Sequence, residues 1–324
     1  MQRRERMRCN RVIEERSQSV KTPLFSASTM NDPNLKRKLM ITGAGGFLGH
    51  RLCRLAVREW QVFGTWRSNC LEMKNVVTIH VDLTDGRRLR ALLEEVRPDG
   101  VIHTAAVTDP NVCQQHPRRT RKINTTAAAD MAGLCADRGI AFVFTSTDLV
   151  FVGESPPYGE EDLPVPVCAY GEQKAAAETL ILDRHPESLV CRLPLMVGPS
   201  KPAGGGFEDR IARCLKKGRP VNLFVDEFRT PVDTDSAAKG LLLALGRVRG
   251  KLHLGGRQRV SRHDIGCYIA DSLRSDRSLL RPVRQKEASL QAPRPADVSL
   301  NSARAYHMGY DPTPLAQAIG HLFE

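Results

Sequence analysis

The stretch LMITGAGGFLG, residues 39–49, decides the fold of this 324-residue chain. Its first four residues are apolar or β-branched and predict a short buried strand, and Gly43, Gly46 and Gly49 follow in a G-x-x-G-x-x-G pattern. Glycine at such a turn permits a tight bend, close approach of backbone to a pyrophosphate, and close packing of helix on strand. The next helix, which begins with Phe47 and Leu48, would face the phosphates with free N–H groups and its positive dipole end. The stretch therefore predicts the strand–turn–helix unit of a dinucleotide site.

The same alternation of short apolar runs and amphipathic stretches continues to about residue 195. Further strands are expected at 62–65, 76–81, 100–103, 141–145 and 189–193. Helices are expected between them at 47–59, 87–96, 121–138 and 170–183. Six strands with helical crossovers predict an α/β fold with a doubly wound, Rossmann-type parallel sheet.

Beyond residue 195 the pattern loosens, which predicts a smaller, interleaved substrate lobe. Helical patterns occur at 207–217, after Gly204–Gly206, and then at 234–245 and 314–322. The expected dinucleotide-binding domain comprises residues 38–195, with 232–250 returning to it. The expected C-terminal substrate lobe comprises residues 196–231 and 251–324. Residues 1–37 are expected to be a basic, disordered leader, with a transit peptide or a start at Met30 or Met40 as other interpretations.

Composition and charge exclude several classes of protein. No apolar run approaches the ~20 residues needed to cross a bilayer, so no membrane partner is expected. The nine cysteines are scattered without a C-x-x-C pair, which favours reduced thiols in a cytoplasmic protein and argues against a metal site. Residues 1–38 hold ten Lys or Arg and four acids, a net charge of +6, which is half of the +12 of the whole chain. The remainder is only mildly basic, so no nucleic-acid partner is expected.

Side chains at the ends of the second, third and fourth expected strands define the cofactor. Arg67 stands where an NAD site usually has an acid for the ribose hydroxyls, and arginine can pair with a 2′-phosphate. NADP(H) is therefore the expected cofactor, with NAD(H) as the alternative. Asp82 and Leu83 are placed to bind the adenine, and the small Ala105 and Ala106 let the cofactor pass close to the backbone. Ligands of such sheets lie at these strand ends.

Three further residues form a candidate catalytic group. Tyr170 and Lys174 are four residues apart, so they share one helical face, and Thr147 ends the fifth strand region. A phenol can protonate a carbonyl oxygen while hydride reaches the carbon. A fixed ammonium at about 4 Å would bring the pKa of the phenol from about 10 to near neutrality. Thr147 could orient the same oxygen, and Lys174 could also hold ribose hydroxyls.

These motifs resemble those of extended short-chain dehydrogenases/reductases, and among them the dTDP-4-dehydrorhamnose reductase group of sugar-nucleotide enzymes. The resemblance covers roughly residues 38–322. The matching segments are TGAGGFLG, VDLTD, VIHTAAVTD, INTTAAADMAGLC, FTSTDLVFVGESPPYGEED, YGEQK, CRLPLMVG, DEFRTPVDTDSAAKGL and APRPADVSL. It implies that Thr147, Tyr170 and Lys174 are the catalytic triad and that Phe207 and Arg229 lie in a sugar-nucleotide pocket. Asp148 is a further candidate for contacting the substrate, or it caps the following turn.

The resemblance implies an oxidoreductase that uses NADPH to reduce the 4-keto group of a nucleotide-linked 6-deoxy sugar, as in dTDP-rhamnose biosynthesis. Two alternatives stay open. Some relatives with the same motifs are NADP-binding regulatory subunits of methionine adenosyltransferase, and others are sugar-nucleotide epimerases or dehydratases. The absence of a Glu after Asp148 counts against dehydration. Leu149 and Val152 depart from the family pattern near the sugar, so the sugar and base stay open. A homodimer is compatible with the resemblance.

Overall fold

The computed structural model describes residues 36–68, 71–199 and 206–324. The expected leader, residues 1–37, lies outside this part of the chain except for its last two residues. Cys9, Cys70, Gly204 and Gly205 also lie outside the described residues.

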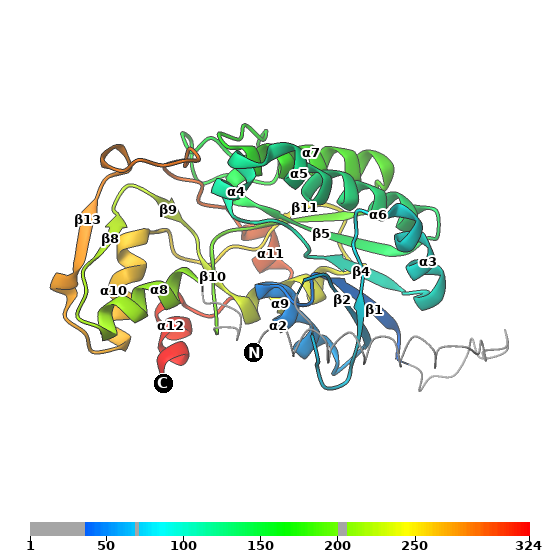
Figure 1. Cartoon of the computed structure of the whole chain (residues 1–324), viewed down its shortest axis with the longest axis horizontal. Coiled ribbons are helices and arrows are strands. Elements are labelled where there is room, and N and C mark those ends of the chain that lie inside the picture. Colours follow the sequence, from blue (N-terminus) through cyan, green and yellow to red (C-terminus); the bar gives the residue numbers. More distant parts are fainter. Residues whose placement is uncertain (1–35, 69–70, 200–205) are drawn as a thin grey trace.

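A seven-stranded parallel sheet forms the centre of the fold (Figure 1). The chain starts at β1, adds β2 and β3 on one side, and then adds β4, β5, β6 and β11 on the other. In such a doubly wound sheet, ligands bind at the carboxyl ends where the strand order reverses. The strands are β1 (Lys38–Thr42), β2 (Gln61–Trp66), β3 (Val76–His80), β4 (Gly100–His103), β5 (Ala141–Thr147), β6 (Leu189–Leu193) and β11 (Gly250–His253).

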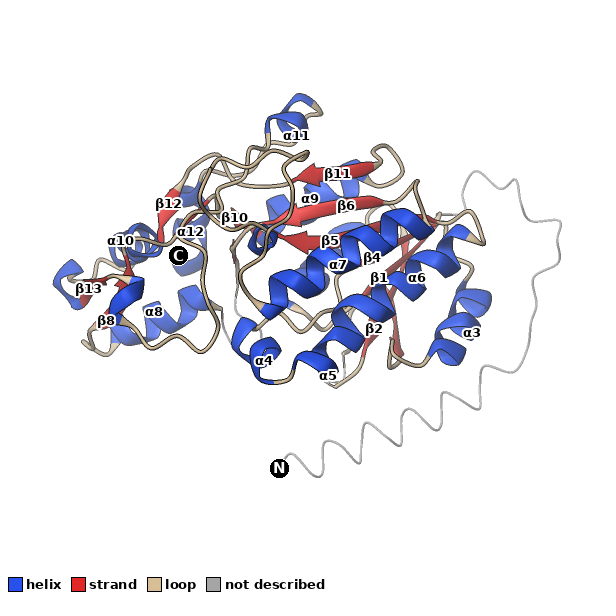
Figure 2. Ribbon diagram, turned by 90° about the horizontal axis from the view of Figure 1, so that it is seen from above, coloured by secondary structure: helices blue, strands red, loops and turns tan. Residues whose placement is uncertain are grey.

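Helices cover both faces of the sheet, because alternate strand residues point to opposite sides. Leu39 and Ile41 of β1 belong to the apolar core under α2 and α9, whereas Met40 belongs to the core under α3, α6 and α7. Figure 2 shows α3, α6 and α7 along one face. These helices are α2 (Phe47–Ala56), α3 (Gly86–Val96), α6 (Ala127–Ala136), α7 (Ala169–Arg184) and α9 (Thr234–Ala244).

A separate apolar core lies beyond the carboxyl ends of the sheet strands. It is built around Ile211, Leu223, Ile265 and Ile319, which come from α8, β8, α10 and α12. Its helices are α8 (Phe207–Lys216), α10 (Arg262–Ser272) and α12 (Leu315–Phe323). Three two-stranded pairs accompany them: β7 (Met196–Val197) with β10 (Val232–Asp233), β9 (Phe228–Arg229) with β12 (Val260–Ser261), and β8 (Val221–Phe224) with β13 (Leu280–Val283).

Short helical segments complete the chain. A π-helix, η1, widens one turn between α5 and α6, and such turns often occur at functional sites. The segments are α4 (Pro110–Gln115), α5 (Pro117–Arg121), η1 (Lys122–Thr126), η2 (Asp148–Val150), η3 (Arg277–Leu279), η4 (Gln285–Glu287) and α11 (Ala303–His307).

The predicted fold class is confirmed, and all six predicted strands are present with ends that differ by at most two residues. The seventh strand, β11, was missed because its four residues, GKLH, contain one strongly apolar side chain. The helix α10 was also missed. The predicted single helix at 121–138 is wrong, because α5, η1 and α6 divide residues 117–136.

Candidate active site

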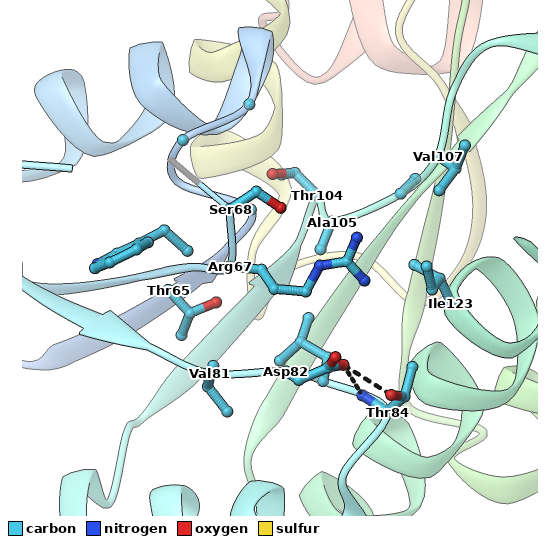
Figure 3. Close-up of a pocket in the computed structure, with 16 residues that line it drawn as sticks. Thr65, Arg67, Ser68, Val81, Asp82, Thr84, Thr104, Ala105, Val107 and Ile123 are labelled. Carbon is cyan, nitrogen blue, oxygen red and sulfur yellow. Dashed lines mark hydrogen bonds between the residues drawn. The ribbon is translucent and has the colours of Figure 1, made fainter. Parts of the chain in front are cut away.

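A cavity of about 320 Å³ opens at the carboxyl ends of β1, β2 and β4 (Figure 3). Seven of the predicted cofactor residues line it: Gly43, Gly46, Arg67, Asp82, Leu83, Ala105 and Ala106. The lining also includes residues that the sequence analysis missed: Gly45, Thr65, Trp66, Ser68, Val81, Thr84, Thr104, Val107 and Ile123. Phe47, Leu48, Gly49, Tyr170 and Lys174 do not line this cavity.

The glycine turn shapes the floor of the cavity. Gly43 has a φ of +70°, and a Cβ added there would lie 2.8 Å from the Cα of Ala105. A Cβ on Gly49 would overlap the carbonyl oxygen of Gly43, to which the Gly46 N–H donates at 2.7 Å. Gly46 is the N-cap of α2 and has no capping side chain, so the first N–H groups of the helix stay available. The glycines therefore let the turn pack closely against itself and Ala105, and Gly46, at the start of the helix, lines the cavity. A helix N-terminus so placed fits a pyrophosphate.

Two charged residues line the same cavity. The exposed side chain of Arg67 extends between Ala105 and Asp82 in Figure 3. The Asp82 carboxylate accepts hydrogen bonds from the Thr84 N–H at 2.9 Å and from the Thr84 hydroxyl at 2.7 Å. These bonds, with smaller help from the Arg67 charge, lower the pKa of Asp82. The site therefore offers a fixed carboxylate and a guanidinium with no ion pair among the described residues.

The three candidate catalytic residues lie where α7 packs against the carboxyl end of β5. Tyr170 and Lys174 are buried on α7, and Thr147 is the last residue of β5. Thr147 begins the turn of η2: its hydroxyl donates to Asp148 Oδ1 at 3.1 Å and accepts from the Leu149 N–H at 3.2 Å. Tyr170 belongs to a cluster against which Val107 packs, and Val107 also lines the cavity.

The π-helix holds this boundary in place. Asn124 lies in η1 and accepts a hydrogen bond from the Val107 N–H at 2.8 Å while its amide donates to the Val107 carbonyl at 3.0 Å. The same amide donates to Gln173 Oε1 of α7 at 2.8 Å. Asn124 was not among the predicted site residues, although it lies in the INTTAAADMAGLC segment. It connects the cavity wall to the helix that carries Tyr170 and Lys174.

The expected effect of Lys174 on Tyr170 is not borne out by the electrostatics. Burial raises the pKa of Tyr170, and a hydrogen bond with Thr147 opposes part of this rise. Burial also lowers the pKa of Lys174 to about 7. The prediction of a near-neutral Tyr170 is therefore wrong for this arrangement: desolvation disfavours the phenolate, and the buried amine is itself only partly charged at neutral pH.

The three candidate substrate residues are joined through buried charges. Arg229 Nε lies 3.5 Å from Asp148 Oδ2, and its Nη2 lies 3.3 Å from Glu227 Oε1. Glu227 also accepts from Arg262 Nε at 2.8 Å, and the Arg262 guanidinium lies 4.9 Å from the centre of the Phe207 ring. A contact path thus runs from Phe207 to Asp148, next to Thr147. Glu227 and Arg262 were missed, although Glu227 lies inside the DEFRTP motif.

Three further structural findings concern metal sites, disulfide bonds and membrane-spanning helices. Within the described residues no group of three or more His, Cys, Asp or Glu side chains could hold a metal ion. The seven cysteines in the described ranges are free. In the same ranges, no helix has both the length and the apolar character needed to cross a membrane.

Comparison with known proteins places the chain in a family. The family model described as the RmlD substrate binding domain matches residues 37–324. The "Probable low-salt glycan biosynthesis reductase" of Haloferax volcanii is 34% identical over 261 residues, which is 79% of this chain and 86% of that protein. Methionine adenosyltransferase 2 subunit beta of Xenopus laevis is 27% identical over 281 residues, or 84% and 83% of the two chains.

Solved structures agree with this assignment. A hypothetical dTDP-4-dehydrorhamnose reductase from Sulfolobus tokodaii is 30% identical, with a TM-score of 0.77 over 86% of this chain and 98% of that one. The dTDP-4-dehydrorhamnose reductase from Bacillus anthracis, solved in complex with NADP, has a TM-score of 0.79 over 89% and 99% of the two chains. Its identity of 22% supports the shared fold alone. The chain therefore belongs to the RmlD substrate binding domain family of extended short-chain dehydrogenases/reductases.

Proposed function

We propose that this protein is an NADP(H)-dependent reductase that acts on the 4-keto group of a nucleotide-linked 6-deoxy sugar. The observation that carries the proposal is the packing of Val107, which lines the cavity, against the buried cluster of Tyr170, on the helix that also carries Lys174. The glycine turn and Arg67 of the same cavity suit a phosphorylated dinucleotide. The reductase relatives from Haloferax volcanii and Sulfolobus tokodaii support the reaction class. When bound, NADPH would supply the hydride.

The cofactor would be held by residues that already converge. The turn formed by Gly43, Gly46 and Gly49 would take the pyrophosphate, Arg67 the 2′-phosphate, and Asp82 the adenine amino group. Arg67 is suited to the 2′-phosphate because a guanidinium binds phosphate oxygens bidentately. This supports NADPH over NADH.

The chain's own residues would handle the proton and the oxygen. The Thr147 hydroxyl orients the substrate carbonyl oxygen, and Tyr170 gives its phenolic proton to that oxygen as negative charge develops. The raised pKa of Tyr170 keeps the phenol protonated before reaction, so the proton is present to be donated, and substrate binding must bring this pKa down for efficient transfer. Asp148, Phe207 and Arg229 would bind the sugar nucleotide or shape its site.

The test follows NADPH absorbance with a dTDP-4-keto-6-deoxy sugar generated in situ. Tyr170→Phe should reduce the rate by at least a hundredfold, because a positioned general acid contributes about 10²–10⁴-fold, and should leave NADPH affinity near that of the wild type. Tyr268→Phe, on the partly buried face of α10, is the matched control. A Tyr170→Phe enzyme with nearly full activity would refute the role of Tyr170.

A second candidate function is that of a non-catalytic NADP-binding regulatory subunit. It is favoured by methionine adenosyltransferase 2 subunit beta proteins from several vertebrates, which are 26–28% identical over at least 84% of this chain. Stoichiometric elution with a methionine adenosyltransferase catalytic subunit on gel filtration, without NADPH oxidation by any keto sugar, would select it. A sugar-nucleotide epimerase is the third candidate, and full occupancy by tightly bound NAD after purification would favour it.

A further inference from the structure

A third buried polar residue continues the spacing of Tyr170 and Lys174 along α7. Glu178 follows Lys174 by four residues, as Lys174 follows Tyr170, so all three lie on one helical face. The exposed fractions of the three residues are 7% for Tyr170, 1% for Lys174 and 2% for Glu178. A buried carboxylate in such a row needs partners of its own, because an isolated charge in the interior is costly.

Glu178 has two such partners, both on neighbouring strands. Ser146 of β5 donates its hydroxyl to Glu178 Oε1. Arg192 of β6, which has no exposed surface, donates from Nη2 to Oε2 at 2.8 Å and from Nε to Oε1 at 3.1 Å. Arg192 is held in turn by the Glu160 carbonyl at 3.3 Å and lies 4.9 Å from the Phe151 ring centre. The carboxylate is therefore fixed in position by groups on β5 and β6.

Lys174 is a buried amine whose charge depends on its neighbours. Its Nζ lies 3.8 Å from the centre of the Phe144 ring on β5, a contact that favours the ammonium form. Burial lowers the pKa of Lys174 to about 7, and the charge of Glu178 is the largest influence in the opposite direction. Without an anion nearby, the amine would lose its proton more readily still.

The other titratable groups around Lys174 do not replace Glu178. His103 of β4 is buried with a pKa lowered to about 3, chiefly by burial and further by Lys174, so its ring is neutral near pH 7. Cys113 of α4 has a pKa raised by burial, so its thiol keeps its proton. Tyr170 stays protonated for the same reason. Arg192 on β6 is a cation and can only disfavour a second positive charge.

We propose that Glu178 is a positioning residue for Lys174: its carboxylate, fixed between Ser146 and Arg192 one helical turn further along α7, keeps the Lys174 side chain charged for binding the nicotinamide ribose. The inference rests on the proposed function only in assigning the ribose to Lys174. Arg192 has two effects. It holds the carboxylate, and its own charge weakens the influence of that carboxylate on Lys174. Removing the Glu178 carboxylate should therefore lower the pKa of Lys174, whereas removing the Arg192 charge should raise it.

The experiment measures NADPH affinity between pH 5.5 and pH 8.5, by nicotinamide fluorescence titration, and needs no turnover. Wild-type affinity should fall as Lys174 loses its proton, and Lys174→Met should lack this part of the pH dependence. If loss of the Glu178 charge lowers the pKa of Lys174 by about one unit, Glu178→Gln should bind NADPH about tenfold more weakly than the wild type at pH 8. At pH 5.5 the two affinities should agree within about twofold. Arg192→Met should shift the decline toward higher pH, because Glu178 then acts on Lys174 alone.

The two single variants each leave a buried charge unpaired, which can unfold the protein. The double variant Glu178→Gln/Arg192→Met removes both charges and keeps similar volumes, so it should fold. It should still bind NADPH several-fold more weakly than the wild type at pH 8. Wild-type affinity of the double variant at that pH would overturn the proposal, and so would an unchanged pH dependence in Lys174→Met. Sugar reduction is scored separately, so its absence would refute the proposed function without affecting this result.

Discussion

Nε of Arg229 lies 3.5 Å from Oδ2 of Asp148, which brings a guanidinium from β9 against a carboxylate at the end of β5. Both side chains are almost fully buried, and Asp148 Oδ2 has no hydrogen-bond partner among the described residues. Burial raises the pKa of Asp148, and Arg229 opposes that rise. The pair connects the candidate catalytic threonine to the strand pair β9–β12, on the side where Phe207 lies.

Arg229→Met should destabilise the protein strongly. The substitution leaves Asp148 buried without an ion-pair partner and Glu227 with Arg262 alone, and breaking a buried ion pair typically costs about 3–5 kcal/mol. Urea denaturation measures the free energy of unfolding. Arg210→Met, an exposed arginine beside Phe207, is the control and should change it by less than about 0.5 kcal/mol. A loss below about 1 kcal/mol for Arg229→Met would mean that solvent or a rearrangement compensates the two carboxylates.

Gly43→Ala should damage both folding and cofactor binding. The backbone at Gly43 has a φ of +70°, and the new Cβ would lie 2.8 Å from Ala105 Cα. Gly218→Ala is the matched control, since its φ is +59° and no atom lies within 4 Å of the added Cβ. The control should lose about 1 kcal/mol of unfolding free energy, and Gly43→Ala should lose more and bind NADPH at least tenfold more weakly. Equal losses in the two variants would show that the contact with Ala105 is unimportant.

Arg67→Ala should reduce the preference for NADPH over NADH. The guanidinium reaches into the cavity (Figure 3), and loss of a charge-assisted contact worth about 1.5–3 kcal/mol corresponds to roughly 10–150-fold in affinity. The Kd for NADPH should rise by that factor, while the Kd for NADH should change by less than threefold. Arg58→Ala, exposed beyond the end of α2, should leave both values unchanged. Equal weakening for the two nucleotides would argue against a 2′-phosphate contact.

The free energy of unfolding should fall as the pH falls below about 6.5. Burial lowers the pKa of His103 to about 3, so the unfolded chain takes up the proton first, and between pH 6.5 and pH 3 folding is increasingly disfavoured. His253 acts in the same direction. On going from pH 7.5 to pH 4.5, the free energy of unfolding of His103→Asn should fall by about 2–3 kcal/mol less than that of the wild type. His116→Asn, at an exposed position, should match the wild type, and an identical pH dependence in His103→Asn would contradict the assignment.

Local signals in the sequence predicted the sheet and the glycine turn. The segment 39–49 contains its strand, its turn and the start of its helix, so neighbouring residues suffice to specify it. The edge strand β11 was missed because four residues with one strongly apolar side chain are too few to show the apolar–polar alternation of a strand. Its pairing with β6 depends on residues about sixty positions away. The seven predicted residues around the cavity come together because they end parallel strands.

Electrostatics at the site could be predicted less well. The four-residue spacing correctly predicted that Tyr170 and Lys174 share a helix, and the same spacing extended once more would have pointed to Glu178. Sequence could not indicate that Arg192, on another strand, pairs with Glu178, or that burial would outweigh the ammonium in setting the pKa of Tyr170. Both depend on packing between elements that the chain brings together only when folded.

The edge position of β11 has a consequence for any shortened form of this protein. A fragment that ends before Thr234 lacks both α9 and β11, so β6 becomes an open edge with unpaired N–H and C=O groups at Leu189–Leu193. The same cut uncovers the apolar side of α2, which α9 otherwise shields. Bare strand edges beside exposed apolar surface promote intermolecular pairing. Fragments of this kind are expected to aggregate, although they contain the whole glycine turn and the Tyr170–Lys174 helix.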